Sequence, residues 1–255
     1  MKRKDDKIHD HPHLETERGI KISKAEYHLL KQLLPWLGFA FAKKSLITDF
    51  VVPTKGDTTR RGRIENVQKS ANGETGLHCL RTFKNHPIKG KTGKHVRGED
   101  EKEISAEKVL LFIMRHIDKL GAPIPYYAKK RWHFEGDYKG YTVTIALDHA
   151  HGLGKYSGYY MEVETILPEK TKRKKVRRAL KAIVRLLKRL VGEHRRSKIS
   201  YRRMLLSTWV QARKASSKKK VKKGARKAKK NYRKLLKKVT AAEGSLDQAE
   251  AQSNS

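Results

Sequence analysis

The chain alternates between short segments with a two-residue polarity pattern and longer segments with a helical period. In a strand, residues two apart point to the same face, whereas an amphipathic helix repeats its apolar residues every three to four positions. Turn-forming Gly, Pro, Asn and Asp separate most of the short segments. We therefore expect eight strands, which span residues 14–22, 45–53, 60–69, 76–84, 94–104, 127–135, 138–148 and 158–167.

Two helices are expected between these strands. Ser23 and Glu26 form a capping box, which predicts a helix over 24–37. Ser105 precedes a second periodic segment over 106–120, and a glycine follows it directly. Residues 149–155 are expected to form a turn, because two closely spaced glycines interrupt the pattern there.

Two further helices are expected after the last strand. Pro168 suits the first turn of a long helix that reaches Val191, and a shorter helix is predicted over 200–213. The long helix has one apolar stripe with Lys and Arg opposite, so we expect it to cover a sheet.

Charged residues recur at two-residue spacing within several predicted strands. For any one strand, a face turned toward solvent is the favoured interpretation of this spacing. As a set, however, the carboxylates fall on the first and last strands and the cations on strands between them, while the opposite faces are apolar. The pairs and triples are Glu15 and Glu17, Arg61 and Arg63, Arg97 with Glu99 and Glu101, Lys129 and Arg131, and Glu162 and Glu164.

A closed barrel would gather these charged faces into one lumen and leave the apolar faces for the helices to cover. We therefore predict an α+β fold, built on an eight-stranded, mostly antiparallel β-barrel with a charged lumen. Arg and Lys in such a lumen suit phosphate oxygens. Carboxylates would repel a polyphosphate directly, but they become useful when they hold Mg²⁺ or Mn²⁺, which prefer oxygen ligands.

Composition adds an anionic partner to this prediction. The 255 residues carry a formal net charge of +35, to which the tail 213–255 contributes 15 Lys and Arg against 3 Asp and Glu. Such a charge favours phosphorylated metabolites, nucleic acid or an acidic surface. No apolar run approaches the roughly 20 residues of a membrane span, the amino terminus lacks a signal-peptide pattern, and Cys79 is the only cysteine, so we expect a cytoplasmic protein.

We expect three parts: a flexible polar leader over 1–13, a barrel domain over 14–212, and the basic tail over 213–255. The tail has a thin apolar seam at helical spacing among its cations. It is expected to be a helix that binds nucleic acid or another acidic surface, or a solvated and partly disordered extension. The seam consists of Val221, Ala225, Ala228, Tyr232, Leu235 and Val239.

Several segments between residues 14 and 206 share their order and charge types with one known family. They are Leu-Glu-Thr-Glu-Arg (14–18), Arg-Gly-Arg (61–63), Leu-Arg-Thr-Phe-Lys (80–84), Arg-Gly-Glu-Asp-Glu (97–101), Ile-Ala-Leu-Asp (145–148) with Gly-Leu-Gly (152–154) and Met-Glu-Val-Glu (161–164), and Ser-Tyr-Arg-Arg-Met-Leu-Leu (200–206). The chain thereby resembles the CYTH superfamily, the triphosphate tunnel metalloenzymes, and is most similar to its class IV adenylate cyclase-like branch.

The resemblance implies a metal-dependent enzyme for a triphosphate such as ATP or inorganic triphosphate. It implies catalytic roles for Glu15, Glu17 and Lys21. The metal ligands, for Mg²⁺ or Mn²⁺, would be Glu15, Glu17, Asp148, Glu162 and Glu164. The triphosphate would be bound by Arg61, Arg63, Lys84, Arg97, Lys129 and Arg131.

One position departs from the pattern of the family. Its opening signature is E-x-E-x-K, and Gly19 stands where the lysine is expected, while Lys21 lies on the same strand face two residues further along. The exact reaction stays open between cyclisation of ATP and hydrolysis of inorganic, thiamine or nucleoside triphosphates. A non-catalytic triphosphate sensor and a nucleic-acid-binding protein are the alternatives, and the oligomeric state is left open, a dimer included.

Overall fold

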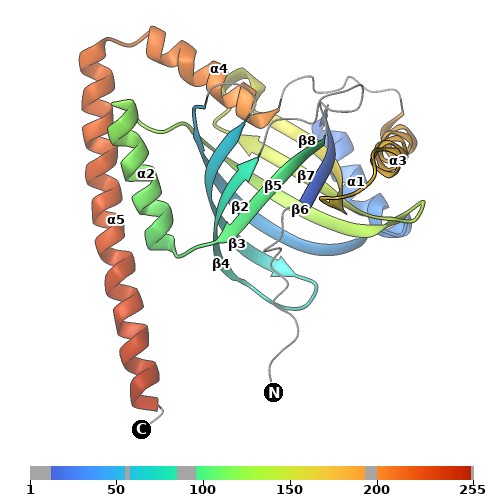
Figure 1. Cartoon of the computed structure of the whole chain (residues 1–255), viewed down its shortest axis with the longest axis horizontal. Coiled ribbons are helices and arrows are strands. Elements are labelled where there is room, and N and C mark those ends of the chain that lie inside the picture. The colour runs from blue at the N-terminus through green and yellow to red at the C-terminus, as the bar shows by residue number, and fades with distance from the viewer. Residues whose placement is uncertain (1–12, 55–57, 85–95, 193–199, 254–255) are drawn as a thin grey trace.

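The computed structural model describes residues 13–54, 58–84, 96–192 and 200–253 (Figure 1). The predicted leader therefore lies outside the described residues, apart from His13. The first two residues of the strand predicted over 94–104 also lie outside them.

Eight strands form one closed barrel, as the alternation of charge predicts. Around the barrel their order is β1, β5, β4, β3, β2, β6, β7, β8, and β8 pairs with β1 to close it. Every pairing is antiparallel. The strands are β1 His13–Ile22, β2 Ala40–Val52, β3 Thr59–Ser70, β4 Gly76–Lys84, β5 Val96–Glu103, β6 Tyr126–Tyr138, β7 Tyr141–His151 and β8 Gly158–Pro168.

Helices cover the outside of the barrel (Figure 1). The predicted capping box of α1 is present: the Glu26 amide donates to the Ser23 hydroxyl, and the Ser23 amide donates to the Glu26 carboxylate. The second helix, α2, is also capped as predicted, with Ser105 before it and Gly121 in the left-handed conformation after it. The helices are α1 Lys24–Trp36, α2 Ala106–Leu120, α3 Arg173–Val191, α4 Tyr201–Lys214 and α5 Lys218–Ser253, with a 3-10 turn η2 over Gly154–Tyr156.

The apolar core lies between the barrel wall and these helices. One cluster joins the outer faces of β1, β6, β7 and β8 to α1 and α3, with Val143, Ile145 and Leu147 fully buried in it. A second cluster joins β2 and β4 to α2. Because the apolar faces of these strands pack outward against the helices, their alternate residues must face the lumen.

The structure corrects three expected boundaries. The second strand begins at Ala40 rather than residue 45, because Phe41 packs its ring against Trp132 and Phe134 of β6. The seventh strand spans Tyr141–His151 rather than 138–148, because Tyr138 still belongs to β6, so that only residues 152–157 remain for the turn that follows it.

The third correction concerns Pro168, which ends β8 instead of opening a helix. Its carbonyl accepts hydrogen bonds from the amide and hydroxyl of Thr171, which makes a turn, and α3 begins only at Arg173.

The basic tail contains a long helix, α5, which lies along α2 (Figure 1). The predicted seam is correct in its centre, since Ala225, Ala228 and Tyr232 pack against the α2 cluster. Leu236 completes the contact, whereas the predicted Leu235 is 45% exposed. Among the described residues, no helix combines the length and apolar character that a bilayer crossing requires.

Candidate active site

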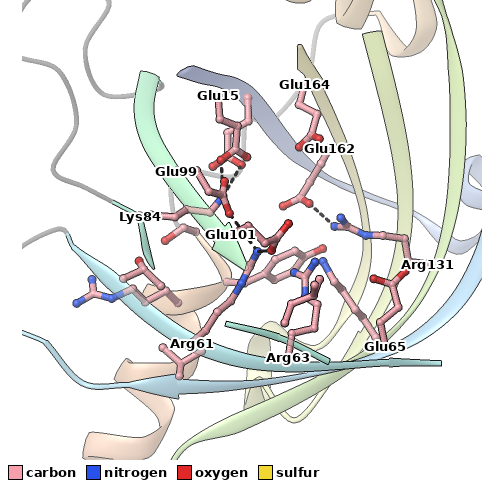
Figure 2. Close-up of a pocket in the computed structure, with 18 of the residues that line it drawn as sticks. Glu15, Arg61, Arg63, Glu65, Lys84, Glu99, Glu101, Arg131, Glu162 and Glu164 are labelled. Carbon is pink, nitrogen blue, oxygen red and sulfur yellow. Dashed lines mark hydrogen bonds and ion pairs between the residues drawn. The ribbon is translucent and has the colours of Figure 1, made fainter. Parts of the chain in front are cut away.

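The lumen contains a cavity of about 350 Å³ that is lined mostly by charged side chains (Figure 2). Strand alternation directs these side chains inward, since each is separated from its lumen-facing neighbour by one outward residue. The cavity is lined by nine of the twelve predicted site residues, which are Glu15, Glu17, Arg61, Arg63, Lys84, Lys129, Arg131, Glu162 and Glu164.

Three carboxylates meet where β1 and β8 pair. Glu17 lies opposite Glu164 in the register, and Glu15 precedes Glu17 by two residues on the same face. One oxygen from each of these three residues lies within 4.8 Å of the others. Like charges directly across a ladder destabilise it, so this group requires a cation or a proton.

Two members of this acidic group, Glu164 and Glu15, have raised pKa values. Burial, and then the charge of Glu15, raises the pKa of Glu164 to about 8. Burial and the charge of Glu17 also raise the pKa of Glu15. Near neutral pH the group therefore holds a proton that a bound cation could replace.

Lys84 is the protein's own cation at this place. Its ammonium lies 2.5 Å from a Glu15 oxygen and 2.8 Å from a Glu99 oxygen. These carboxylates raise the pKa of Lys84 well above its ordinary value despite burial, which acts in the opposite direction. Lys84 therefore stays charged and links the acidic group to the cations across the lumen.

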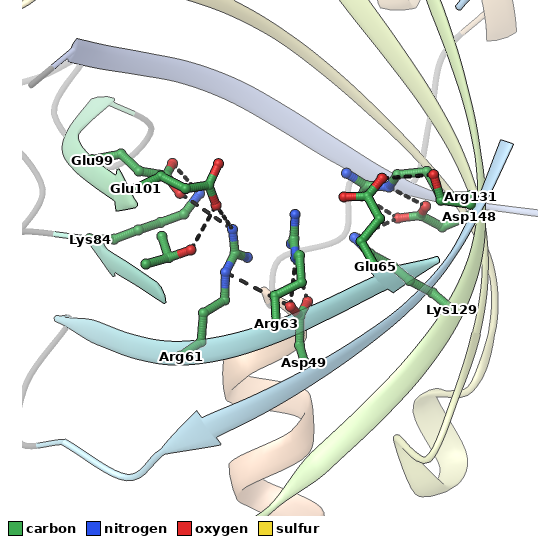
Figure 3. A network of polar contacts seen from close by, with 12 residues as sticks. Asp49, Arg61, Arg63, Glu65, Lys84, Glu99, Glu101, Lys129, Arg131 and Asp148 are labelled. Carbon is green, nitrogen blue, oxygen red and sulfur yellow. Dashed lines mark hydrogen bonds and ion pairs between the residues drawn. The ribbon is translucent and has the colours of Figure 1, made fainter. Parts of the chain in front are cut away.

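Arg61 and Arg63 of β3 form part of the opposite wall (Figures 2 and 3). Arg63 donates two hydrogen bonds to Asp49, from Nε at 2.8 Å and from Nη2 at 3.2 Å. Arg61 makes longer contacts, at 3.3 Å to Glu99 and 3.5 Å to Glu101. Although burial opposes it, the two guanidinium groups hold the pKa of Asp49 well below its usual range. Arg63 is thus fixed, whereas Arg61 is held more weakly.

Arg131 of β6 makes the strongest contacts of the network (Figure 3). Its guanidinium donates two hydrogen bonds to Asp148, at 2.6 and 2.5 Å, and another to Glu162. The fully buried Asp148 also accepts hydrogen bonds from Lys129 at 3.3 Å and from the Tyr201 hydroxyl at 2.9 Å. Asp148 therefore orients two predicted phosphate-binding cations and is not part of the three-carboxylate group; a metal-ligand role for it stays a prediction.

Of the predicted residues whose side chains are described, Asp148 and Lys21 are not in the cavity lining. Lys21 lies near the end of β1, is exposed, and pairs in register with Tyr160 of β8. Arg97 pairs with Glu15 in the β1–β5 register, but its side chain lies outside the described residues. At Gly19, a β-carbon would lie 3.7 Å from Cγ of Glu162, which is ordinary van der Waals distance, so the position has room for a side chain.

Several residues of the lumen are not among the predicted site residues. Glu65, Tyr127 and His133 each lie two positions from a predicted cation on the same strand, so extending the alternation by one step would have found them. Glu99 and Glu101 were recognised as part of a charged triple but not placed in the site. The two-residue alternation does not predict the roles of Asp49 and Tyr201, because the residues with which they form hydrogen bonds, Arg63 and Asp148, come from distant segments of the chain.

The three carboxylates fit a divalent metal. They supply hard oxygen donors close together, and burial together with the neighbouring carboxylates raises the pKa values of Glu15 and Glu164, so a bound cation would stabilise their charged forms. Glu15, Glu17 and Glu164 would hold the ion, with Glu162 beside them in the cavity.

The fold and the site together define a class of protein, in which a closed antiparallel barrel carries groups of carboxylates and cations that face each other across the lumen. Known structures share this fold. The PH1819 protein from Pyrococcus horikoshii OT3 is 25% identical, with a TM-score of 0.57, over 76% of this chain and 99% of that one. A structure described as a "putative adenylate cyclase" from Vibrio parahaemolyticus is 16% identical, with a TM-score of 0.51, over 77% of this chain and 99% of that one.

The closed barrel fold that the resemblance to the CYTH or triphosphate tunnel superfamily implies is thus confirmed by the structure, and these solved structures share it. No protein-family model and no curated protein matches the chain.

Proposed function

We propose that this protein is a metal-dependent enzyme that binds and processes a triphosphate inside the barrel. One observation carries the proposal: a single cavity holds three clustered carboxylates on β1 and β8 and a set of cations on the facing strands (Figure 2). A binding site for phosphate alone needs no clustered carboxylates, whereas a site for phosphate with a divalent metal needs both groups.

The cations would bind the phosphate oxygens. Arg61 is the best placed to change partners, because its contacts with Glu99 and Glu101 are long and its guanidinium lines the cavity. Arg63 and Arg131 each have a carboxylate behind them, at Asp49 and Asp148, that keeps the guanidinium in place. This arrangement preorganises the phosphate-binding groups before the substrate arrives.

Glu15, Glu17 and Glu164 would hold Mg²⁺ or Mn²⁺. Such an ion neutralises phosphate charge and makes phosphorus more open to attack. Lys84 contacts Glu15 and Glu99 at the edge of this group, so it would orient these carboxylates and offer its own charge to the substrate.

Two reactions fit this site. Cyclisation of ATP to cyclic AMP and pyrophosphate is the first candidate, because the segment that resembles the class IV cyclases places Ser200, Tyr201 and Arg202 in the cavity lining. Hydrolysis of a triphosphate is the second, favoured by a cavity of about 350 Å³, near the lower limit of about 300 Å³ for small-molecule sites.

A product assay tests the proposal. Wild-type protein and Glu15→Ala/Glu17→Ala would receive ATP or inorganic triphosphate with Mg²⁺ or Mn²⁺. We expect turnover by the wild type and a loss of at least about 100-fold in the variant. Glu135→Ala/Glu169→Ala, which removes two exposed carboxylates, is the matched control and should retain activity.

The products identify the reaction. Cyclic AMP with pyrophosphate would establish the cyclase, and orthophosphate release the triphosphatase. Mn²⁺ binding, followed by electron paramagnetic resonance, should weaken in the Glu15→Ala/Glu17→Ala variant whatever the reaction is. Tight triphosphate binding without turnover or metal dependence would overturn the proposal in favour of a triphosphate sensor.

A further inference from the structure

The basic helix α5 is attached to the barrel domain along one face. Ala225, Ala228 and Tyr232 pack on the cluster that α2 forms with the barrel wall, and the Tyr232 ring meets Phe50 of β2 at a centroid distance of 6.1 Å. Lys229 donates to both carboxylate oxygens of Asp118 in α2, at 2.6 Å each. These contacts fix which side of α5 faces outward.

The outward side of α5 is densely cationic. Twelve of the 20 residues over 218–237 are Lys or Arg, and none is Asp or Glu. Eleven of these twelve residues are exposed, and Lys229 is partly buried. We call this outward surface the α5 basic face; it consists of Lys218, Lys219, Lys220, Lys222, Lys223, Arg226, Lys227, Lys230, Arg233, Lys234 and Lys237.

This density of charge opposes folding of the helix by itself. Like charges three or four residues apart on a helix destabilise it. A protein surface that serves only solubility usually intersperses positive and negative charges. The packing on α2 offsets this repulsion and holds the cations in a row. Over 218–237 the row is about 30 Å long.

We propose that the α5 basic face is a binding surface for the phosphate backbone of double-helical nucleic acid. A duplex presents one negative charge per about 1.7 Å of its axis, so about 30 Å of duplex carries some 18 charges against the cations of this face. Lys and Arg that replace condensed counterions supply most of the affinity of sequence-independent binding. The surface needs no base contacts for this role, because phosphate contacts fix position without reading sequence.

The alternative anionic partner, a lipid membrane, fits less well. A helix that lies in a membrane interface buries an apolar face among the lipids. In α5 that face is already packed on α2, and Leu235 is the one large apolar side chain of the described part of this helix that is markedly exposed. The α5 basic face therefore offers charge without an insertion surface.

This proposal is independent of the proposed enzymatic function. The α5 residues whose side chains are described, 218–237, lie outside the cavity lining, and the helix packs on α2 outside the barrel wall (Figure 1). Experiments can therefore refute the nucleic-acid-binding proposal without refuting the proposed enzymatic function, and the reverse.

The test compares two full-length variants of equal net charge. One carries Lys→Gln at four positions of the α5 basic face, Lys223, Lys227, Lys230 and Lys234. The matched control carries Lys→Gln at four exposed positions of α3, Lys174, Lys175, Lys181 and Lys188. Binding to fluorescent 20-base-pair RNA and DNA duplexes is measured by anisotropy at several salt concentrations, and circular dichroism confirms that the helices are retained.

We expect the α5 variant to bind both duplexes at least about tenfold more weakly. Its slope of log affinity against log salt should be shallower by about 3 to 4, since each lost phosphate contact removes about 0.9. The α3 control should stay within about twofold of wild type. Equal losses in the two variants would overturn the proposal, because they would indicate attraction by total charge.

Vesicles containing one-third phosphatidylserine form the second arm. The wild type should bind them at least tenfold more weakly than the duplexes at the same salt concentration. Vesicle binding as tight as duplex binding, lost in the α5 variant, would overturn the proposal in favour of a membrane surface.

Discussion

The cations of the barrel lumen and those of α5 are the same residue types in opposite physical states. Arg63 and Arg131 are buried, and each donates two hydrogen bonds to a fully buried aspartate. On α5, Lys223 and Lys227 are exposed, and carboxylates are absent from their stretch of the helix. A buried charge must be paired, whereas an exposed one keeps its water.

This difference separates two kinds of recognition. The lumen cations are fixed in direction, so they suit a small ligand whose oxygens must be placed accurately. The cations of α5 form an exposed row along one helix, which suits a long polyanion that is recognised by its charge and not by its shape. Substitutions in the two regions should therefore change different quantities.

The largest effect is expected where a buried pair is broken. Arg131→Met should lower the free energy of unfolding by about 3–5 kcal/mol, because the buried Asp148 would lose its bidentate partner. Urea denaturation measures the loss. Lys227→Met on α5 is the control and should change the free energy by no more than about 0.5 kcal/mol. Similar losses in both variants would remove the distinction between the two regions.

The pH dependence of stability should depend on Glu164. Its pKa is raised to about 8, so the folded state keeps a proton that the unfolded state releases. The stabilisation of the folded state by this proton is complete below about pH 4.5 and is lost as the pH rises through about 8. Without metal, the stability of wild type relative to Glu164→Gln should fall by more than about 1 kcal/mol from pH 5 to pH 8, since one pKa unit corresponds to about 1.4 kcal/mol.

Chemical denaturation at both pH values, with and without Mg²⁺, provides the measurement. Mg²⁺ should restore the stability of the wild type at pH 8 more than that of Glu164→Gln, because the metal binds the deprotonated carboxylates. A pH-independent difference between the two proteins would show that Glu164 does not hold this proton.

Gly19→Lys tests the departure from the signature of the family. A β-carbon at this position meets Glu162 at ordinary van der Waals distance, so the lysine should be accommodated with a change in stability below about 1 kcal/mol. We expect turnover of the triphosphate to rise by about tenfold, as a further cation reaches the acidic group. Gly19→Met, similar in length without the charge, should leave turnover unchanged; an equal rise with Met would point to packing and not to charge.

The smallest effect is expected at the exposed pair between α2 and α5. Asp118→Asn removes the contacts of Lys229, but the Asp118 side chain is 55% exposed. The loss in free energy of unfolding should therefore be below about 1 kcal/mol. Tyr232→Ala should cost more, because it removes an apolar contact with the α2 cluster. If Asp118→Asn proved the more damaging change, the attachment of α5 would be mainly electrostatic.

The sequence by itself determined the barrel and its charged lumen. A strand exposes alternate residues to opposite faces, so the charges at two-residue spacing and the apolar residues between them fix an inner and an outer surface. The caps at Ser23 and Ser105 placed two helices almost to the residue, because capping is a local interaction. The strand position of Pro168 was missed, because a proline suits both a strand end and a helix start.

Only the tertiary structure decided which charges meet. The pairs Arg63–Asp49 and Asp148–Tyr201 join residues that are 14 and 53 positions apart in the chain, and no local pattern specifies such partners. The order of the strands around the barrel brought Glu164 to Glu17, and the packing on α2 selected the face of α5 that carries its cations outward. Local periodicity thus sets the direction in which a side chain points, whereas barrel closure and helix packing set what that side chain meets.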